Sequence, residues 1–428
     1  MIAKKLHKVT LKRSIDKSLT GRMGLVWFEQ SLRDFGIEQM VSKEYGRKAN
    51  REIEAVDKIM AGAMSIIAGA ERLEDLEILR ADEGLGRNVG MERIASADTL
   101  REYLKDKKNN HKQVRINEAL VVKALRQAEA KELTYDNDAV YIDSEKDCAA
   151  VSYKGVRQMS GLLGYVAGLG LAITAEYRRG NESPANGVLE QLRRAIRLAK
   201  RARKRIAIFR SDSVAYTNDI IDLCNEKNIR YYISARKDES VQALIESASG
   251  EEWQELKTTE ETTRPNEYIE RTHITHKGRL MRLMILRWRT AARDLFGPEY
   301  GYHAIATNDR EIGVEEWLHI HNGRMNSENY HKELKYGCNI RYTPSNDFEL
   351  SRGYFLLNVL AYNMAQILKR YYLGNEARTW TLKTLRYRFI YVCGKIIKTG
   401  RKYYCKILNV VDSVYELFEN CQARIVSG

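Results

Sequence analysis

The segment that decides the fold begins at Asn137 and reads NDAVYIDSEKDCAAVSYKG, ending at Gly155. Apolar and polar residues alternate in it, which is typical of short, half-buried strands. The same pattern continues along the chain, and it predicts strands at residues 139–143, 149–153, 162–167 and 171–177. Polar or glycine-containing turns separate these strands, so we expect an antiparallel meander.

Helices and strands alternate after the meander. We expect a helix at 187–203, the strand IAIFR at 206–210, a helix at 218–227 and a strand at 229–235. Strands that alternate with helices favour parallel pairing, so this half of the pattern predicts a mixed α/β sheet.

The alternation of helices and strands becomes less regular over residues 236–299. A polar stretch, 257–264, separates strand-like pieces at 268–272 and 280–288, which predicts a β-rich insertion. The α/β pattern then resumes with a strand at 302–307, and a long helical region at about 325–372 is broken near Pro344.

The part of the chain before the meander is predicted to be mainly helical. Apolar residues recur at helical spacing between residues 51 and 107, and Ser96 is a suitable N-cap. Several short helices with tight turns form either a helix-turn-helix-like DNA-binding unit or a small structural bundle.

The amino-acid composition excludes several classes of protein. The chain has 428 residues, 71 Lys and Arg against 57 Asp and Glu, and 44% hydrophobic residues, so we expect a basic, globular protein with an anionic partner. Its six cysteines form no C-x-x-C pair, which favours a reducing compartment such as the cytosol over a disulfide framework. No apolar run approaches the roughly 20 residues of a spanning helix, so a membrane protein is not expected.

The positive charge is concentrated in two runs. Residues 193–205 contain eight basic residues and no acidic one, and residues 369–406 contain eleven basic residues and one acid, Glu376. The first run fits a solvated helix face as well as it fits a phosphate-binding surface. The second run interleaves tyrosines with its cations, which indicates nucleic-acid binding, with aromatic core strands as the alternative.

Three carboxylates stand out by position: Asp143 and Asp212 close predicted strands, and Glu328 lies in a predicted helix. Singly, each aspartate is an ordinary turn former or helix cap. Together, two aspartates at the ends of neighbouring strands could share Mg²⁺, which prefers oxygen ligands, and Glu328 would be the third ligand. At helical spacing Arg324, Glu328 and Lys335 share one face, either as a surface ion-pair set or as a carboxylate flanked by phosphate-binding cations.

These residues resemble a family signature. The run HNGRMNSENYHKELKY (321–336) is similar to the Tyr, Arg, Glu, Lys signature Y-x2-R-x3-E-x6-K of DDE transposases of bacterial insertion sequences, in the branch with a β-strand insertion. Arg324, Glu328 and Lys335 match it, whereas His321 occupies the tyrosine position. In relatives that tyrosine packs against DNA near the cleaved end, and a histidine offers less surface for stacking.

Further blocks follow in the family's order. Residues 141–181, which contain Asp143 and YKG and end in EYRRGN, look like the first catalytic block. RSDS (210–213) followed by Tyr216 looks like the second. LEDLEILRADEGLGRNVG (73–90) and TLRYRFIYVCGKIIKTGRK (384–402) resemble the terminal regions.

The resemblance implies a ribonuclease-H-like mixed α/β sheet with a β-rich insertion and an all-α N-terminal DNA-binding domain. The implied boundaries are a helical DNA-binding region at 1–135, a catalytic domain at 136–235 and 300–375, an insertion at 236–299, and a basic DNA-contacting region at 376–428.

The resemblance also implies the chemistry. Asp143, Asp212 and Glu328 would hold two Mg²⁺ ions, for which Mn²⁺ may substitute, and hydrolysis at the element ends would be followed by attack of the freed 3′-OH on target DNA. The partners implied are terminal inverted repeats, target DNA and a second copy of the chain in a synaptic homodimer, in a bacterial cytoplasm near the nucleoid. The residues implied to contact DNA are His321, Arg324, Lys335, Arg210 and Asn326.

Two other classes remain open at this point. One is a sequence-specific DNA-binding protein without catalysis, such as a repressor or a domesticated transposase. The other is a zinc protein, suggested by His273, His276, His319 and His321, although zinc requires more Cys or His at close spacing.

Overall fold

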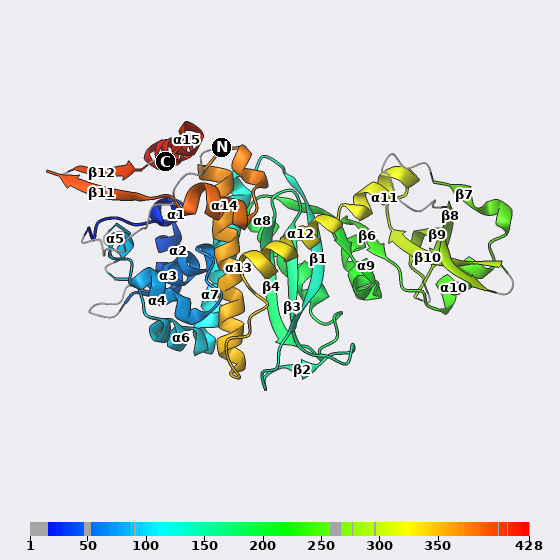
Figure 1. Cartoon of the computed structure of the whole chain (residues 1–428). Helices are drawn as coiled ribbons and strands as arrows, with labels where there is room; N and C mark the ends of the chain where they lie inside the picture. The colour runs from blue at the N-terminus through cyan, green and yellow to red at the C-terminus, as the bar shows by residue number, and fades with distance from the viewer. Residues whose placement is uncertain are drawn as a thin grey trace, which may run out of the picture.

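A ten-stranded mixed sheet lies at the centre of the structure, a computed structural model of the chain (Figure 1). The structure describes residues 16–46, 53–86, 88–89, 91, 93–256, 267–275, 277–294, 297–400, 402–408 and 410–427. The predicted polar stretch at 257–264 and His276 lie outside the described residues.

The first half of the sheet begins with the predicted meander. Its strands are β1 (Glu132–Asp143), β2 (Ala150–Val151), β3 (Arg157–Val166) and β4 (Leu171–Arg179). Strand β3 pairs antiparallel with β1, β2 and β4. Strands β5 (Arg205–Ser211) and β6 (Arg230–Ser234) then add in parallel beside β1, which confirms the mixed α/β sheet. Helices α8 (Val188–Arg201) and α9 (Asn218–Glu226) connect these strands.

The inserted strands extend the same sheet. They are β7 (Gln254–Glu255), β8 (Glu267–Ile274), β9 (Leu280–Asp294) and β10 (Gly297–Thr307), preceded by α10 (Glu239–Glu246). Strand β10 pairs with β9 along most of its length and also with β6 through residues 305–307. The β-rich element is therefore hydrogen-bonded into the central sheet rather than joined to it by a loop.

Helices fill the other half of the molecule. They are α1 (Met23–Asp34), α2 (Ile37–Tyr45), α3 (Ala55–Ile67), α4 (Leu76–Arg80), α5 (Glu83–Gly86), α6 (Ala97–Lys105) and α7 (Lys107–Gln127). Ser96 caps α6, since its hydroxyl accepts a hydrogen bond from the Thr99 amide at 3.2 Å. The predicted N-cap is thus confirmed.

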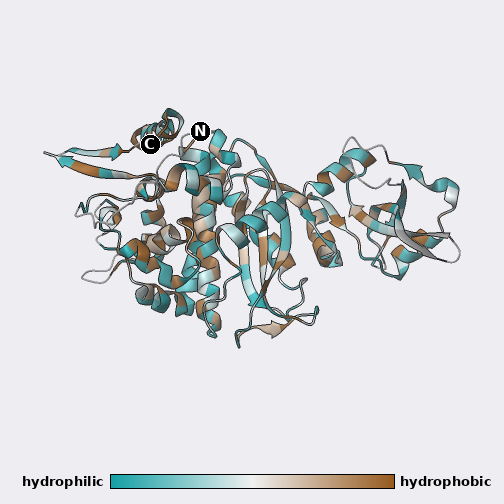
Figure 2. Ribbon diagram, in the orientation of Figure 1, coloured by the Kyte–Doolittle hydropathy of each residue, from teal (hydrophilic) through white to brown (hydrophobic). Residues whose placement is uncertain are grey.

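The predicted helical region at 325–372 is divided in the structure. Helix α11 (Val314–Asn322) precedes it, α12 (Met325–Lys332) is its first part, a break contains Pro344, and α13 (Phe348–Ile367) is its second part. Helix α13 is apolar on nearly every side because it packs on α3, α6, α7 and β4. One hydrophobic core consequently spans the helical half and the sheet, and hydrophobic residues appear in both (Figure 2).

The C-terminal segment returns to the helical half. It contains α14 (Leu382–Leu385), the strands β11 (Gly394–Thr399) and β12 (Lys402–Ile407), and α15 (Asp412–Ser427). The two strands form a hairpin that projects from the body of the molecule (Figure 1). Within the described residues, the structure contains no helix with the length and apolar composition needed to cross a membrane.

Candidate active site

Two aspartates lie side by side where β5 ends next to β1. The parallel register pairs Asp136 with Arg210 and Asn137 with Ser211, so the next residues along the two strands are Asp138 and Asp212. Strand spacing puts such neighbours roughly 5 Å apart at the backbone. Asp212 also caps the short helix that follows, because its side chain accepts a hydrogen bond from the Val214 amide at 3.1 Å.

A buried ion pair fixes the register beneath these aspartates. The Arg210 guanidinium donates to both carboxylate oxygens of Asp136, at 2.7 and 2.8 Å, and Asp136 is fully buried. A third donor of Arg210 binds the carbonyl of Ile320 at 2.8 Å. Gly323 leaves room for this arginine, since a Cβ atom at that position would collide with its Nη1. Arg210 therefore ties β1 and β5 to the end of α11.

Helix α12 brings the third carboxylate to the same edge. Its inner side is buried through Ser327 and His331, and the His331 ring lies 5.3 Å from the ring of Tyr165 on β3. Glu328 is exposed to solvent on this helix. Arg324, at the start of α12, places its Nη1 3.3 Å from the Asp138 carboxylate.

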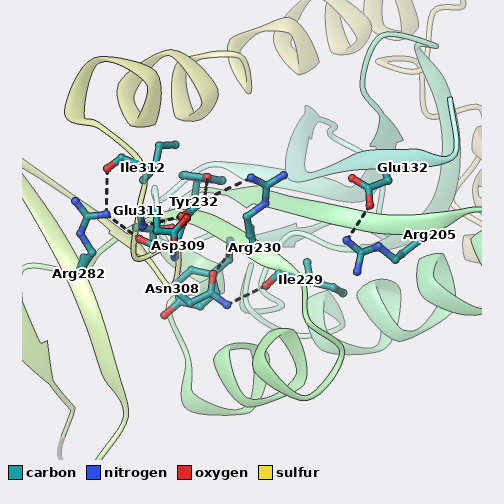
Figure 3. A network of polar contacts seen from close by, with 12 residues as sticks. Glu132, Arg205, Ile229, Arg230, Tyr232, Arg282, Asn308, Asp309, Glu311 and Ile312 are labelled. Atoms are coloured by element: carbon teal, nitrogen blue, oxygen red, sulfur yellow. Dashed lines mark hydrogen bonds and ion pairs between the residues drawn. The ribbon is translucent and has the colours of Figure 1, made fainter.

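A polar network anchors the loop that leads into α11 (Figure 3). Asp309 accepts a hydrogen bond from the Tyr232 hydroxyl at 3.0 Å and pairs with Arg230 at 3.5 Å. Arg282 donates to the carbonyls of Asp309 and Ile312, at 2.9 and 3.1 Å. Because α11 leads directly into α12, this network fixes the origin of the helix that carries Glu328.

The electrostatics of the group favour a bound cation. Burial raises the pKa of Asp138, and the nearby Glu328 charge raises it further, while Arg324 opposes the shift. Burial and the Asp138 charge likewise raise the pKa of Asp212. These carboxylates therefore repel one another, and a divalent cation would relieve that repulsion. We name Asp138, Asp212 and Glu328 the carboxylate group.

Asp143 is not part of the carboxylate group, which corrects the sequence-based expectation. It is exposed at the far end of β1, pairs in register with Gln158 and accepts a hydrogen bond from that side chain. Five residues along a strand separate it from Asp138, roughly 16 Å, and the odd spacing directs the two side chains to opposite faces of the sheet. Asp138 occupies the place expected for Asp143.

Two residues expected to contact DNA are buried. Arg210 is held by Asp136, as described above, and is only 7% exposed. His321 is also 7% exposed, its Nε2 lies 3.2 Å from the Ser234 hydroxyl, and burial lowers its pKa to about 3. Neither side chain is available for DNA, so for these two the expectation is wrong. Instead, both side chains hold α11 against the sheet: Arg210 binds the Ile320 carbonyl, and His321 contacts Ser234.

The other three expected DNA contacts lie near the surface. Asn326 is exposed on α12, Arg324 is partly buried beside Asp138, and Lys335 is partly exposed in the turn after α12. The helix ends before Lys335 and continues as a single wider turn, Glu333–Gly337, so the α-helical spacing assumed from Arg324 to Lys335 does not hold throughout.

The carboxylate group fits a hard divalent cation by its chemistry. It offers oxygen ligands alone, which suits Mg²⁺ or Mn²⁺ better than zinc. As the side chains stand, no three His, Cys, Asp or Glu residues among the described ones could already hold a metal ion together. Asp138 is engaged by Arg324, so a cation would compete with that guanidinium for the carboxylate.

Comparisons with known proteins show the family to which the chain belongs. None of the curated proteins matches the sequence. Among solved structures, the cryo-EM structure of the piggyBac transposase synaptic complex with hairpin DNA is similar with a TM-score of 0.43 and 11% identity, over 80% of this chain and 74% of that chain. A family model described as Transposase DDE domain group 1 matches residues 6–427. Because that match spans nearly the whole sequence, the chain belongs to the DDE transposase family.

Proposed function

We propose that the chain cleaves DNA at the ends of a mobile element and joins the freed ends to target DNA, with Asp138, Asp212 and Glu328 as metal ligands. The observation that carries the proposal is the side-by-side position of Asp138 and Asp212, with Glu328 close enough to raise the pKa of Asp138. The order of β1, β3, β5 and β6 is consistent with a ribonuclease-H-like catalytic domain.

The residues of this chain would divide the work as follows. The carboxylate group would hold Mg²⁺ or Mn²⁺ next to the scissile phosphate. When bound, such ions lower the pKa of an attacking water and stabilise the leaving oxygen. Arg324 lies beside Asp138, and Lys335 follows on the same segment, so both would bind phosphate oxygens that flank the reacting one. Asn326, exposed on α12, would contact the DNA next to them.

Each step of the reaction transfers one phosphoryl group. In the first, water attacks the phosphodiester at the element end, the P–O3′ bond breaks, and the proton lost by water balances the one gained by the new 3′-OH. In the second, that 3′-OH attacks a target phosphodiester and releases another 3′-OH, so no external energy source is required. Two ends must be joined, so we infer that two copies of the chain act together.

The test compares four variants of the full chain. Asp138→Asn, Asp212→Asn and Glu328→Gln should each lose at least about 1,000-fold in cleavage of DNA that contains the element's own ends, equivalent to about 4 kcal/mol of transition-state stabilisation. Asp143→Asn is the matched control, and its cleavage rate should stay within about threefold of wild type. EDTA should abolish cleavage, and Mn²⁺ should restore it.

Two outcomes would contradict this assignment. If Asp138→Asn cleaves normally and Asp143→Asn does not, the ligand set is wrong. If the wild-type protein binds the ends but cuts nothing with Mg²⁺ or Mn²⁺, the protein is a DNA-binding protein without catalysis. Thermal unfolding of each variant, with and without Mn²⁺, separates loss of metal binding from loss of folding, because a ligand that binds only the folded state raises the unfolding temperature.

A further inference from the structure

The charged residues of the β11–β12 hairpin are all positive. Between Glu376 and Asp412 the sequence contains no acidic residue, and the hairpin itself includes four lysines within its two strands. It projects from the helical half, on the side of the molecule opposite the inserted strands (Figure 1). A projecting, two-stranded element without acids is suited to an extended polyanion.

One face of the hairpin secures it to the protein. Cross-strand partners share a face, and the pair Ile396 and Cys405 lies partly buried against the hydrophobic core, together with Ile407. At the base, Gly394 and Thr20 exchange two backbone hydrogen bonds of 3.0 Å. The hairpin is therefore oriented by the helical half, and its other face must point outward.

The outward face combines cations with an aromatic ring. Lys402, Tyr404 and Lys406 alternate along β12, and their partners on β11 are Thr399, Ile397 and Lys395. Lys402, Tyr404 and Lys406 are all exposed, and half of the Tyr404 surface is accessible. Lysines alone would suffice to prevent pairing with another sheet edge. An exposed tyrosine between them is not needed for that purpose, but suits contact with a sugar or a base.

We propose that the β11–β12 hairpin lies in the major groove of duplex DNA, remote from the carboxylate group, with Lys402 and Lys406 on phosphates and Tyr404 between them. The major groove is roughly 12 Å wide and admits a two-stranded β-ribbon. The proposal rests on the proposed function, because it requires that the chain holds DNA. In this proposal the hairpin binds a stretch of duplex that lies away from the cleaved phosphate.

The test compares two double variants of the full chain by fluorescence anisotropy with a 30-base-pair duplex. Lys402→Gln with Lys406→Gln should weaken binding about tenfold and lower the slope of log K against log salt by about 1.8, since each phosphate contact contributes about 0.9. Lys227→Gln with Lys277→Gln removes the same charge from exposed positions elsewhere and should leave both quantities unchanged. The proposal is overturned if the two double variants behave alike.

A second measurement tests the groove. The wild-type protein should protect guanine N7, which faces the major groove, from dimethyl sulfate, and the Lys402/Lys406 variant should lose that protection at one group of positions. Unchanged protection, or an altered oligomeric state in place of altered DNA affinity, would show that the hairpin binds another copy of the chain and would overturn the proposal. In both cases cleavage by the wild-type protein still decides the proposed function separately.

Discussion

Replacing Arg210 with methionine should destabilise the protein more than any exposed substitution of the same size. Arg210 is 7% exposed, and it gives two hydrogen bonds to Asp136, which is completely buried. The methionine would fill much of the same volume but would leave a carboxylate without its partner. Removing one member of a buried ion pair costs about 3–5 kcal/mol, most of it from the charge that stays behind.

The loss of stability in Arg210→Met should depend on pH, and the burial of Asp136 sets the direction of this dependence. Burial raises the pKa of Asp136, and Arg210 opposes that rise, so the pKa should climb further without the arginine. An acid whose pKa is higher in the folded state binds more protons there, and stability then falls as pH rises through the interval between the two pKa values. The deficit of Arg210→Met should therefore be larger at pH 8 than at pH 5.

Urea unfolding followed by circular dichroism at both pH values provides the assay. Arg193→Met is the matched control: Arg193 pairs with Glu190 while both side chains are about half exposed, so its loss should cost under about 0.5 kcal/mol. Adding Asp136→Leu to Arg210→Met should recover stability to within about 1 kcal/mol of wild type. The reasoning is refuted if Arg210→Met costs less than about 1 kcal/mol, or if the double variant is no more stable than the single one.

Three further predictions concern the site and its support. Gly323→Ala should lower cleavage at least about tenfold with little loss of DNA binding, because the new methyl group would displace Arg210 and shift α12; unchanged cleavage would count against this. Mn²⁺ binding, followed by electron paramagnetic resonance, should weaken on acidification with a midpoint above the ordinary aspartate pKa of roughly 3.9, because the pKa values of Asp138 and Asp212 are raised; a midpoint below that value would contradict the assignment. Ser96→Ala should cost about 1 kcal/mol of unfolding free energy through loss of the α6 cap, measured by urea unfolding, and no change would show that the cap is dispensable.

Periodicity in the sequence was sufficient for most elements of the sheet. The strand predicted at 206–210 corresponds to β5, Arg205–Ser211, and the helix predicted at 187–203 corresponds to α8, Val188–Arg201. The local signals agree with the tertiary structure there because α8 buries one apolar face, whereas β5 is a short run that is buried on both faces. The strand predicted at 149–153 shrinks to two residues in β2, since its neighbours form turns instead.

The place of Asp138 in the carboxylate group could not be predicted in the same way. Strand β1 was expected to begin near residue 139, so its closing residue, Asp143, was taken as the edge of the sheet. The strand begins at Glu132, and the relevant edge is set by the neighbouring strand β5, which ends beside Asn137. Only the pairing register, a non-local property, identifies Asp138. In the sequence, the run DND (136–138) looks like a polar turn. In the structure it lies within β1, where Arg210 neutralises the buried charge of Asp136.

Sequence spacing was informative for Glu328 and Arg324 but not for His321. The signature helix is present as α12, and Arg324 does reach a carboxylate of the group. His321 lies one helix earlier and packs between Ser234 and His303, and these contacts come from strands nearly 90 and 20 residues away along the chain. Burial of that kind leaves no trace in a local pattern.

Strand β10 pairs with β9 along most of its length, and its last three residues, 305–307, pair with β6 on the other side as well. Backbone hydrogen bonds therefore connect the inserted strands to β6, which in turn pairs with β5. A force applied to the inserted strands would be transmitted to β6 through these backbone hydrogen bonds. Replacing the inserted strands with those of another protein would accordingly require the pairing register of β10 with β6 to be kept unchanged.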